Sequence, residues 1–331
     1  MSWARQSVPG HLMASPLLRQ VAWRIALGVL LLLGVSMLIF AGTQLLPGDV
    51  AQAVLGQSAT PEALANLRRD MGLNDPAVLR YWHWFTHALV GDFGKALSNG
   101  QDISAALGKR LANTLFLAFW AALVSVPLAI GLGLLAVRHR NGFVDRLISG
   151  LGLASTSLPE FFVGYVLMYF FAVKLQWVTS VSTVFEGMPL AERLEAIVLP
   201  VAVLTTAVLA HMMRMTRAAI LNVMQSAYIE TAELKGLGAL RVIYRHALPN
   251  ALAPIINVVM LNMAFLVVGV VVVEVIFVYP GMGQYLVDHV AKRDVPVVQA
   301  CGLIFASVYI GMNIIADIAG VMSNPRLRHP K

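Results

Sequence analysis

Charged residues are scarce in this sequence. Only 12% of its 331 residues are Asp, Glu, Lys or Arg, whereas 58% are hydrophobic. A soluble domain typically carries about 25% charged residues. The composition therefore excludes an ordinary soluble domain and indicates a protein whose main solvent is the lipid bilayer.

Cysteine is nearly absent. Cys301 is the only one in the sequence, so a disulfide within the chain and a Cys-x-x-Cys metal site are both excluded. Because Cys301 falls within a long apolar window, a buried and unreactive thiol is its expected state.

Motifs of enzymes and motors are missing as well. The sequence contains no GxxxxGK[ST], HExxH or GxSxG pattern, and GDFGK at 91–95 lacks the spacing of a phosphate-binding loop. Any ATP that drives this protein must therefore bind to another chain. His83 and His87 are four residues apart and could hold a metal ion, but no third ligand is near them. Trp82 and Trp84 beside them favour a helix at the membrane interface instead.

Long apolar windows are what the sequence has in quantity. Each is at least 18 residues long and carries at most one charge. A helix needs about 20 apolar residues to cross a hydrocarbon core of roughly 30 Å. The sequence therefore predicts an all-α polytopic membrane protein with six transmembrane helices. The windows are 25–46, 111–137, 147–173, 196–213, 246–287 and 295–325.

The distribution of charge predicts the orientation of these helices. Arg5, Arg19 and Arg24 precede the first window with no acid among them, and that window is longer than the apolar part of a cleavable signal peptide. With the N-terminus inside, the inside segments hold 14 of the 24 Lys and Arg residues but only three acids. The outside segments hold ten basic and eleven acidic residues. Both termini are therefore predicted inside, and the net charge of +7 requires no nucleic-acid partner.

A single transmembrane domain is expected over residues 1–331. Its largest segment outside the membrane is 46–112, on the extracytoplasmic side. There, Thr60 is placed as the N-cap of a short helix, with Pro61 at its first position and Gly72 near its end. The segments predicted to be cytoplasmic are the N-terminus 1–24, a polar segment at 218–250 and the tail 322–331.

Two of three carboxylates at membrane depth have simple structural explanations. A carboxylate there costs a few kcal/mol unless it faces protein or water. Glu274 precedes a Tyr-Pro-Gly sequence by five residues and is expected near the outer interface. Asp317 lies near the inner end of the last window, close enough to Arg326 and Arg328 to form an ion pair.

The third carboxylate, Glu160, directly follows Pro159 in the middle of a window. The proline frees a backbone carbonyl and bends a helix, and a bent helix that lines a wet cavity would tolerate both features. Glu160 could line a substrate path, or it could be a buried acid that is hydrogen-bonded to a neighbouring helix. The sequence leaves both interpretations open.

A polar stretch, YIETAELKGLGALRVIYRHALPN at 228–250, separates two apolar windows. Residues 219–235 have a helix-forming composition, and Gly236 is placed to end that helix in the left-handed conformation. A second short helix would follow, before Pro249 and Pro254 start the fifth membrane helix.

Such a cytoplasmic helix-turn-helix presents a fixed shape to a partner protein, and a plain loop would suffice if nothing docked there. The alternative is an amphipathic helix on the inner leaflet, held by Arg241 and Arg245.

These residues resemble the EAA loop of ABC-importer permeases. Glu230-Thr231-Ala232, Gly236 after three further residues, and Leu248-Pro249 match that loop, although Thr231 stands where the general pattern has alanine. The resemblance extends over almost the whole chain, through an ordered series of motifs. These are LLPGDV (45–50), MGLNDP (71–76), GDFG (91–94), RLANTL (110–115), SLPEFF (157–162), KGLGALRVIYRHALPNAL (235–252), VVVEVIF with YPGMG, RDVPVVQ (293–299) and NPRLR near the end. The series is similar to the peptide/nickel subfamily, and to its first, B-type permease component.

The resemblance implies a subunit with the type I importer architecture that forms the translocation path in a bacterial cytoplasmic membrane. It implies a second homologous permease, two cytoplasmic ATPase subunits that bind ATP and Mg, and an extracytoplasmic solute-binding protein. The subunit itself would hold no cofactor and catalyse no bond chemistry. Substrates in this subfamily include dipeptides, oligopeptides, glutathione, nickel complexes, opines and peptide antibiotics, and the sequence does not choose among them. The residues implied for coupling to the ATPase are Tyr228, Glu230, Thr231, Ala232, Gly236, Leu237, Arg241, Leu248 and Pro249.

Other classes of protein remain as alternatives at this point. A stand-alone secondary transporter or channel should show an ion-coupling site or an inverted repeat, and the sequence shows neither. A membrane-embedded hydrolase should show nucleophile or metal motifs, which are also missing.

Overall fold

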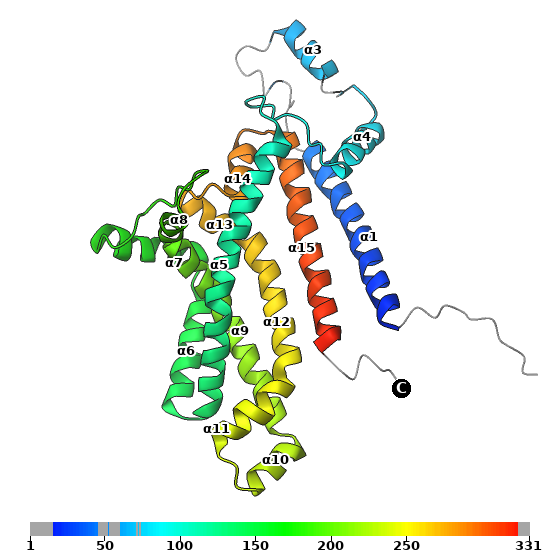
Figure 1. The fold of residues 1–331 in the computed structure, drawn as a ribbon. Coiled ribbons are helices and arrows are strands. Elements are labelled where there is room, and N and C mark those ends of the chain that lie inside the picture. Colours follow the sequence, from blue (N-terminus) through cyan, green and yellow to red (C-terminus); the bar gives the residue numbers. More distant parts are fainter. Residues whose placement is uncertain (1–15, 46–51, 53–59, 71, 73, 324–331) are drawn as a thin grey trace, which may run out of the picture.

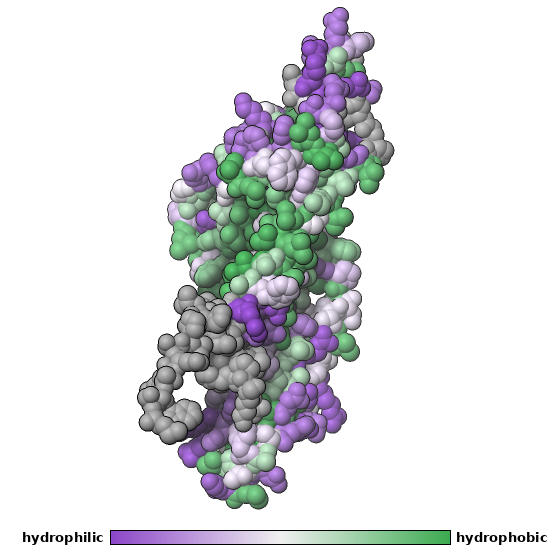
Figure 2. Space-filling view, turned by 90° about the vertical axis from the view of Figure 1, so that its right-hand side faces the viewer, coloured by the Kyte–Doolittle hydropathy of each residue, from purple (hydrophilic) through white to green (hydrophobic). Residues whose placement is uncertain are grey.

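The computed structural model describes residues 16–45, 52, 60–70, 72 and 74–323. Within this part of the chain, five helices are long and apolar enough to cross a membrane, and a bent pair of helices makes a sixth span if counted as one. Figure 2 shows hydrophobic residues gathered across the middle of one face, between hydrophilic parts above and below. The five spans are Arg19–Gln44, Ile103–Arg138, Val198–Met224, Ala239–Ile276 and Val295–Gly320.

The third predicted span is broken rather than straight. Helix α6 (Phe143–Ser157) and helix α7 (Glu160–Leu167), which continues as a π-helix to Lys174, meet at 104°. Leu158 is extended, with ψ 130°, because the ring of Pro159 disfavours a helical residue before it. The bend that Pro159 predicts within 147–173 is therefore confirmed.

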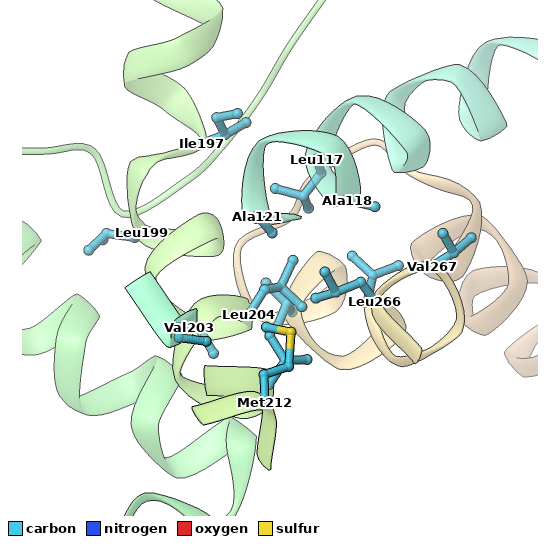
Figure 3. Packing of buried hydrophobic residues seen from close by; sticks show 14 of the residues in the cluster. Leu117, Ala118, Ala121, Ile197, Leu199, Val203, Leu204, Met212, Leu266 and Val267 are labelled. Atoms are coloured by element: carbon cyan, nitrogen blue, oxygen red, sulfur yellow. The ribbon is translucent and has the colours of Figure 1, made fainter. Parts of the chain in front are cut away.

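Three helices form the centre of the bundle: α5 (Ile103–Arg138), α9 (Val198–Met224) and α12 (Leu248–Gly269) (Figure 1). Small residues let them approach closely, and a Cβ on Gly133 of α5 would lie 2.9 Å from the Thr216 methyl of α9. Buried side chains of all three meet in one apolar cluster, including Leu117, Leu204 and Leu266 (Figure 3).

Helix α1 (Pro16–Gln44) lies at the periphery, where it packs along α15 (Val295–Ser323) (Figure 1). Arg24 of α1 forms an ion pair with Asp317 of α15. Asp317 is thus paired as expected, but with a different partner, because the packing of α1 along α15 brings Arg24 level with it. The predicted partners Arg326 and Arg328 lie outside the described residues.

Two short helices follow α1 on the predicted outer side. In α3 (Pro61–Asp70), the Thr60 hydroxyl accepts a hydrogen bond from the Ala63 N–H at 3.2 Å, and Gly72 has φ +60°, so the predicted cap and turn are confirmed. Helix α4 (Ala77–Leu89) lies against the outer end of α1, with Tyr81 hydrogen-bonded to Ser36 at 2.8 Å.

The two histidines of α4 do not share a ligand. His87 contacts the Asp92 carboxylate at 3.1 Å, and this hydrogen bond holds the pKa of Asp92 below its usual value. Among the described residues, no group of three metal-binding side chains surrounds His83 or any other residue. Cys301 is fully buried, as predicted.

A buried polar network joins elements at the outer end of the bundle. Helix α12 leads through α13 (Val271–Ile276) into α14 (Met282–Ala291). Glu274 accepts hydrogen bonds from the Thr114 hydroxyl at 2.6 Å and from the Gly283 and Gln284 N–H groups at 2.7 and 3.1 Å. The Thr114 hydroxyl oxygen in turn accepts the Met282 N–H at 2.8 Å. Thr114 and Glu274 thereby satisfy three free N–H groups at the start of α14.

The sequence places Glu274 near the outer interface, and the structure adds that it is fully buried in this network. This burial could not be read from hydropathy, because the partners of Glu274 come from α5 and from the start of α14.

Candidate functional site

The polar stretch between α9 and α12 forms a compact element at one end of the bundle (Figure 1), on the side that the charge distribution predicts to be cytoplasmic. Helix α9 runs on to Met224, and after a turn at Gln225 and Ser226 helix α10 spans Ala227–Leu234. The single helix predicted over 219–235 is therefore wrong. Ser226 is extended, with ψ 145°, and its hydroxyl donates back to the Val223 carbonyl, so the chain breaks there instead of continuing.

Gly236 ends α10 in the left-handed conformation that the sequence predicts, with φ +75°. The Gly236 N–H donates to the Glu233 carbonyl at 2.8 Å, and the Leu237 N–H donates to the Ala232 carbonyl at 3.3 Å. This pair of bonds is the Schellman arrangement, in which glycine avoids the penalty that a Cβ would suffer. No atom lies within 4 Å of the position that a Cβ on Gly236 would take.

One face of the element is anchored on the bundle. Ile229 and Ala232 of α10 are buried, and Leu237 packs against them. They join an apolar cluster with the inner ends of α5 and α9 and with the start of the following helix. The other buried members of this cluster are Leu134, Val137, Ile220, Val242, Ile243, Ala247, Ala251 and Ile255.

The second predicted short helix is not separate from the fifth membrane helix. Helix α11 (Ala239–Arg241), a π-helical segment (Val242–Ala247) and α12 form one continuous run. Pro249 lies in the first turn of α12, as predicted, but α12 continues directly from the preceding helical segments instead of starting after a loop. A wider π turn just before Pro249 fits a residue that has no N–H to donate to the preceding turn.

Most of the predicted coupling residues lie on or beside the outer face of this element. Glu230, Gly236 and Arg241 are exposed, and Pro249 is exposed where α12 begins. The Thr231 hydroxyl, which the usual alanine lacks, donates to the Ala227 carbonyl at 2.9 Å and is thus hydrogen-bonded within α10. The remaining members are Tyr228, whose hydroxyl donates to the His246 carbonyl at 3.4 Å, the half-buried Leu237 and Leu248, and the buried Ala232.

Sequence reasoning missed three exposed apolar side chains in this element. Leu234 is 83% exposed, Tyr244 is 54% exposed and Leu240 is 44% exposed. Exposed large apolar residues on a charged element indicate a surface that a partner covers. Their position in an otherwise polar stretch was the signal that could have identified them.

Pro159 and Glu160 lie elsewhere, at the break between α6 and α7. Glu160 is the first residue of α7, which packs against α9 and α13. Its side chain is half-buried, and its Oε1 atom has no hydrogen-bond partner among the described residues. The structure does not bring this pair together with the element that contains α10.

Comparison with known families decides what kind of protein carries this element. Residues 125–329 match the model of the binding-protein-dependent transport system inner membrane component, and residues 17–125 match the N-terminal model of the same transport systems. The chain belongs to this permease family. It is thus a permease subunit of an ABC importer, a system that contains further subunits.

Curated relatives align with this permease over nearly its full length. It is 33% identical to a probable peptide ABC transporter permease protein, y4tP, of Sinorhizobium fredii, over 89% of this chain and 94% of that protein. It is 35% identical to the glutathione transport system permease protein GsiC of Salmonella typhimurium, over 90% and 95% of the two chains. Among solved structures, the inward-facing MetNI methionine ABC transporter aligns with 66% of this chain and 95% of its own, with a TM-score of 0.47 and 18% identity.

Proposed function

We propose that this permease imports peptides or related small solutes across a bacterial cytoplasmic membrane, with α10 as the helix that docks into the ATPase subunit. The resemblance of its motifs to the peptide/nickel subfamily and the relatives named for peptide and glutathione transport support the substrate class. The proposed partners are a second homologous permease, two ATPases that bind ATP and Mg, and an extracytoplasmic solute-binding protein.

The observation that carries this proposal is the two-faced character of the element around α10. Its inner face is fixed to α5, α9 and α12 by buried apolar residues, while its outer face presents Glu230, Leu234 and Tyr244. A rigid element that is anchored to three central helices can pass the motion of a docked ATPase into the membrane. A loop without a buried face could not transmit such a motion.

A pair of glycine variants tests the coupling role. Gly236→Val places a β-branched residue at φ +75°, at a cost of roughly 1–2 kcal/mol. Gly238→Val is the matched control, because Gly238 has φ −64° and its Cβ would also meet open space. We expect both variants to insert normally, and only Gly236→Val to lose stimulation of ATP hydrolysis by loaded binding protein and to lose uptake. A fully stimulated complex that carries Gly236→Val would refute the coupling role.

Side-chain charge offers a second test of the same surface. Glu230→Lys should weaken retention of the ATPase, because a reversed charge on the docked face opposes the contact, whereas Arg241→Ala should be milder, since one exposed charge contributes little. If the element lay on the membrane surface instead, loss of Arg241 and Arg245 would matter most.

We further propose that Glu160 lines the solute path, because an unpartnered carboxylate at membrane depth needs water or a charged solute. Glu160→Gln should leave assembly intact and reduce uptake of solutes with a free amine. Glu192→Gln, on the exposed helix α8 (Leu190–Ala196), is the control. Unchanged uptake with lowered stability would make Glu160 a structural residue.

A further inference from the structure

The inner half of α9 exposes a stripe of residues that includes His211, Arg214 and Asn222. His211, Arg214, Met215, Ala218 and Asn222 are all exposed. Their spacing of three or four residues places them on one face of the helix. Between Leu199 and Ala210, the outer half of the same helix has no exposed residue.

The depth of this stripe is set by helix geometry. His211 is thirteen residues from the outer end of α9 at Val198, which is about 20 Å at 1.5 Å per residue. Arg214 is three residues further in. With a hydrocarbon core of roughly 30 Å that starts at the outer end of α9, both residues lie in its inner half.

Contact with lipid would be unfavourable for the polar residues of this surface. Polar and ionisable residues at membrane depth almost always face a bundle interior or a water-filled cavity. By contrast, the exposed residues on the neighbouring helix α6 include Phe143, Leu147 and Leu151, as expected for a face toward acyl chains. The α9 stripe is therefore suited to water, and the α6 face to lipid.

The hydrogen bonds of the stripe leave its donors available. The Asn262 amide nitrogen on α12 donates to the Val258 carbonyl at 2.8 Å and lies 3.2 Å from Nδ1 of His211. The Val258 carbonyl can only accept, so the atom of Asn262 that contacts it must be the amide nitrogen, which is a donor. The same nitrogen faces Nδ1 of His211, so Nδ1 is the acceptor and the proton of the neutral ring lies on Nε2. His211 can thus donate a hydrogen bond outward.

Arg214 adds a positive charge to this donor. Its Nε donates to the Ala210 carbonyl at 3.3 Å, and among the described residues no carboxylate lies within ion-pair distance of it. Arg217 on the next turn is different, because Asp145 binds it through two bonds of 2.8 Å. Helix α9 itself contains no Asp or Glu.

We infer that His211 and Arg214 form a water-filled, anion-attracting station on the inner half of the solute path, which receives a carboxylate group of the transported solute. This inference rests on the proposed import function and adds the charge of the group that the path accepts. A planar guanidinium and an imidazole N–H are donors that suit carboxylate oxygens.

The test measures the charge preference of the stripe without requiring the natural solute. In a Cys301→Ala background, Ala218→Cys places a thiol one turn below Arg214. Two methanethiosulfonates of similar size, the 2-carboxyethyl anion and the 2-aminoethyl cation, are reacted with the complete importer complex in nanodiscs. The thiolate attacks the thiosulfonate sulfur, a mixed disulfide forms and methanesulfinate leaves. Any change in thiolate fraction affects both reagents equally, so the ratio of the two rates reports the local potential.

We expect the thiol that Ala218→Cys introduces to react with both reagents, and faster with the anion. Adding Arg214→Gln should lower the anion-to-cation rate ratio by about tenfold. Leu153→Cys on α6 should be inert toward both reagents, because this exposed apolar position faces lipid. The inference is wrong if the thiol at position 218 is inert, or if Arg214→Gln leaves the anion-to-cation rate ratio unchanged. Stimulated ATP hydrolysis, measured on the same samples, tests the coupling function separately, so that failure of one inference is distinguished from failure of the other.

Discussion

At the scale of single residues, conformation is more predictable from the sequence than environment is. The left-handed Gly236 and the Thr60 cap follow from local rules, and both are found as expected. Burial of Glu274 could not be foreseen, because its partner Thr114 is 160 residues away and single-sequence patterns carry no information on such pairs. Local preferences are readable from neighbours in sequence, whereas a buried hydrogen bond depends on neighbours in space.

Gly281 shows how tightly the Glu274 network is packed. A Cβ on Gly281 would lie 1.9 Å from Oε1 of Glu274, so Gly281→Ala must displace the carboxylate from its three donors. Overpacking of this kind costs about 1–3 kcal/mol, and we expect a clearly lower Tm for the solubilised protein in a thermal scan.

Gly311→Ala on α15 is the matched control, because its Cβ meets no atom within 4 Å and alanine favours a helix. The control should keep or slightly raise the Tm. Equal Tm values for the two variants would mean that Glu274 can leave the start of α14 without loss, and that the network is not a stabilising feature.

At the scale of elements, hydropathy locates the membrane helices and misses where they end. The window 196–213 stops where α9 becomes polar, yet α9 continues for eleven residues to Met224. Hydropathy measures which side chains lipid accepts, and a helix keeps its backbone hydrogen bonds where its side chains turn polar, whether they face water within the membrane, as proposed for Arg214, or lie beyond the bilayer. Likewise Pro249 marks the first turn of α12, yet the helical run begins earlier, at Ala239.

The turn between α5 and α6 gives an element-scale prediction. Asp145 is buried and binds Arg217 of α9 through two bonds, and it also accepts the Asn141 N–H at 3.0 Å. Removal of one member of a buried pair leaves an uncompensated charge, which costs roughly 3–5 kcal/mol, and less here because Arg217 is 29% exposed. We therefore expect Asp145→Asn to lower the Tm markedly.

Two comparisons decide whether the loss comes from the unpaired charge. Arg217→Gln combined with Asp145→Asn should recover part of the Tm, since no charge then remains unpaired. Glu186→Gln breaks the fully exposed pair with Lys109 and should leave the Tm unchanged. A double variant no better than Asp145→Asn alone would assign the loss to packing.

At the scale of the whole molecule, the six-span arrangement is predictable and the break in the third span is only partly so. Pro159 indicates a bend, but a proline kink does not specify 104°. That angle depends on the packing of α7 against α9 and α13, which lie far away in the sequence. The mutual positions of the helices are likewise not readable from periodicity, because nearly every face of these apolar helices is hydrophobic.

The predicted orientation, with both termini inside, is the whole-molecule property most directly open to test. In a Cys301→Ala background, single cysteines at Ser98 and Thr183 should react with a membrane-impermeant maleimide added outside intact cells, and one at Ala239 should react only after the membrane is opened. Ser98, Thr183 and Ala239 are all exposed, so a failure to react would report the side of the membrane and not burial of the thiol. Ser182, next to Thr183, is buried and would be a poor reporter. The expectation follows from the excess of Lys and Arg on one side. Labelling of Ala239→Cys from outside would show that the orientation is the reverse of the predicted one, and α10 would then face away from any cytoplasmic ATPase.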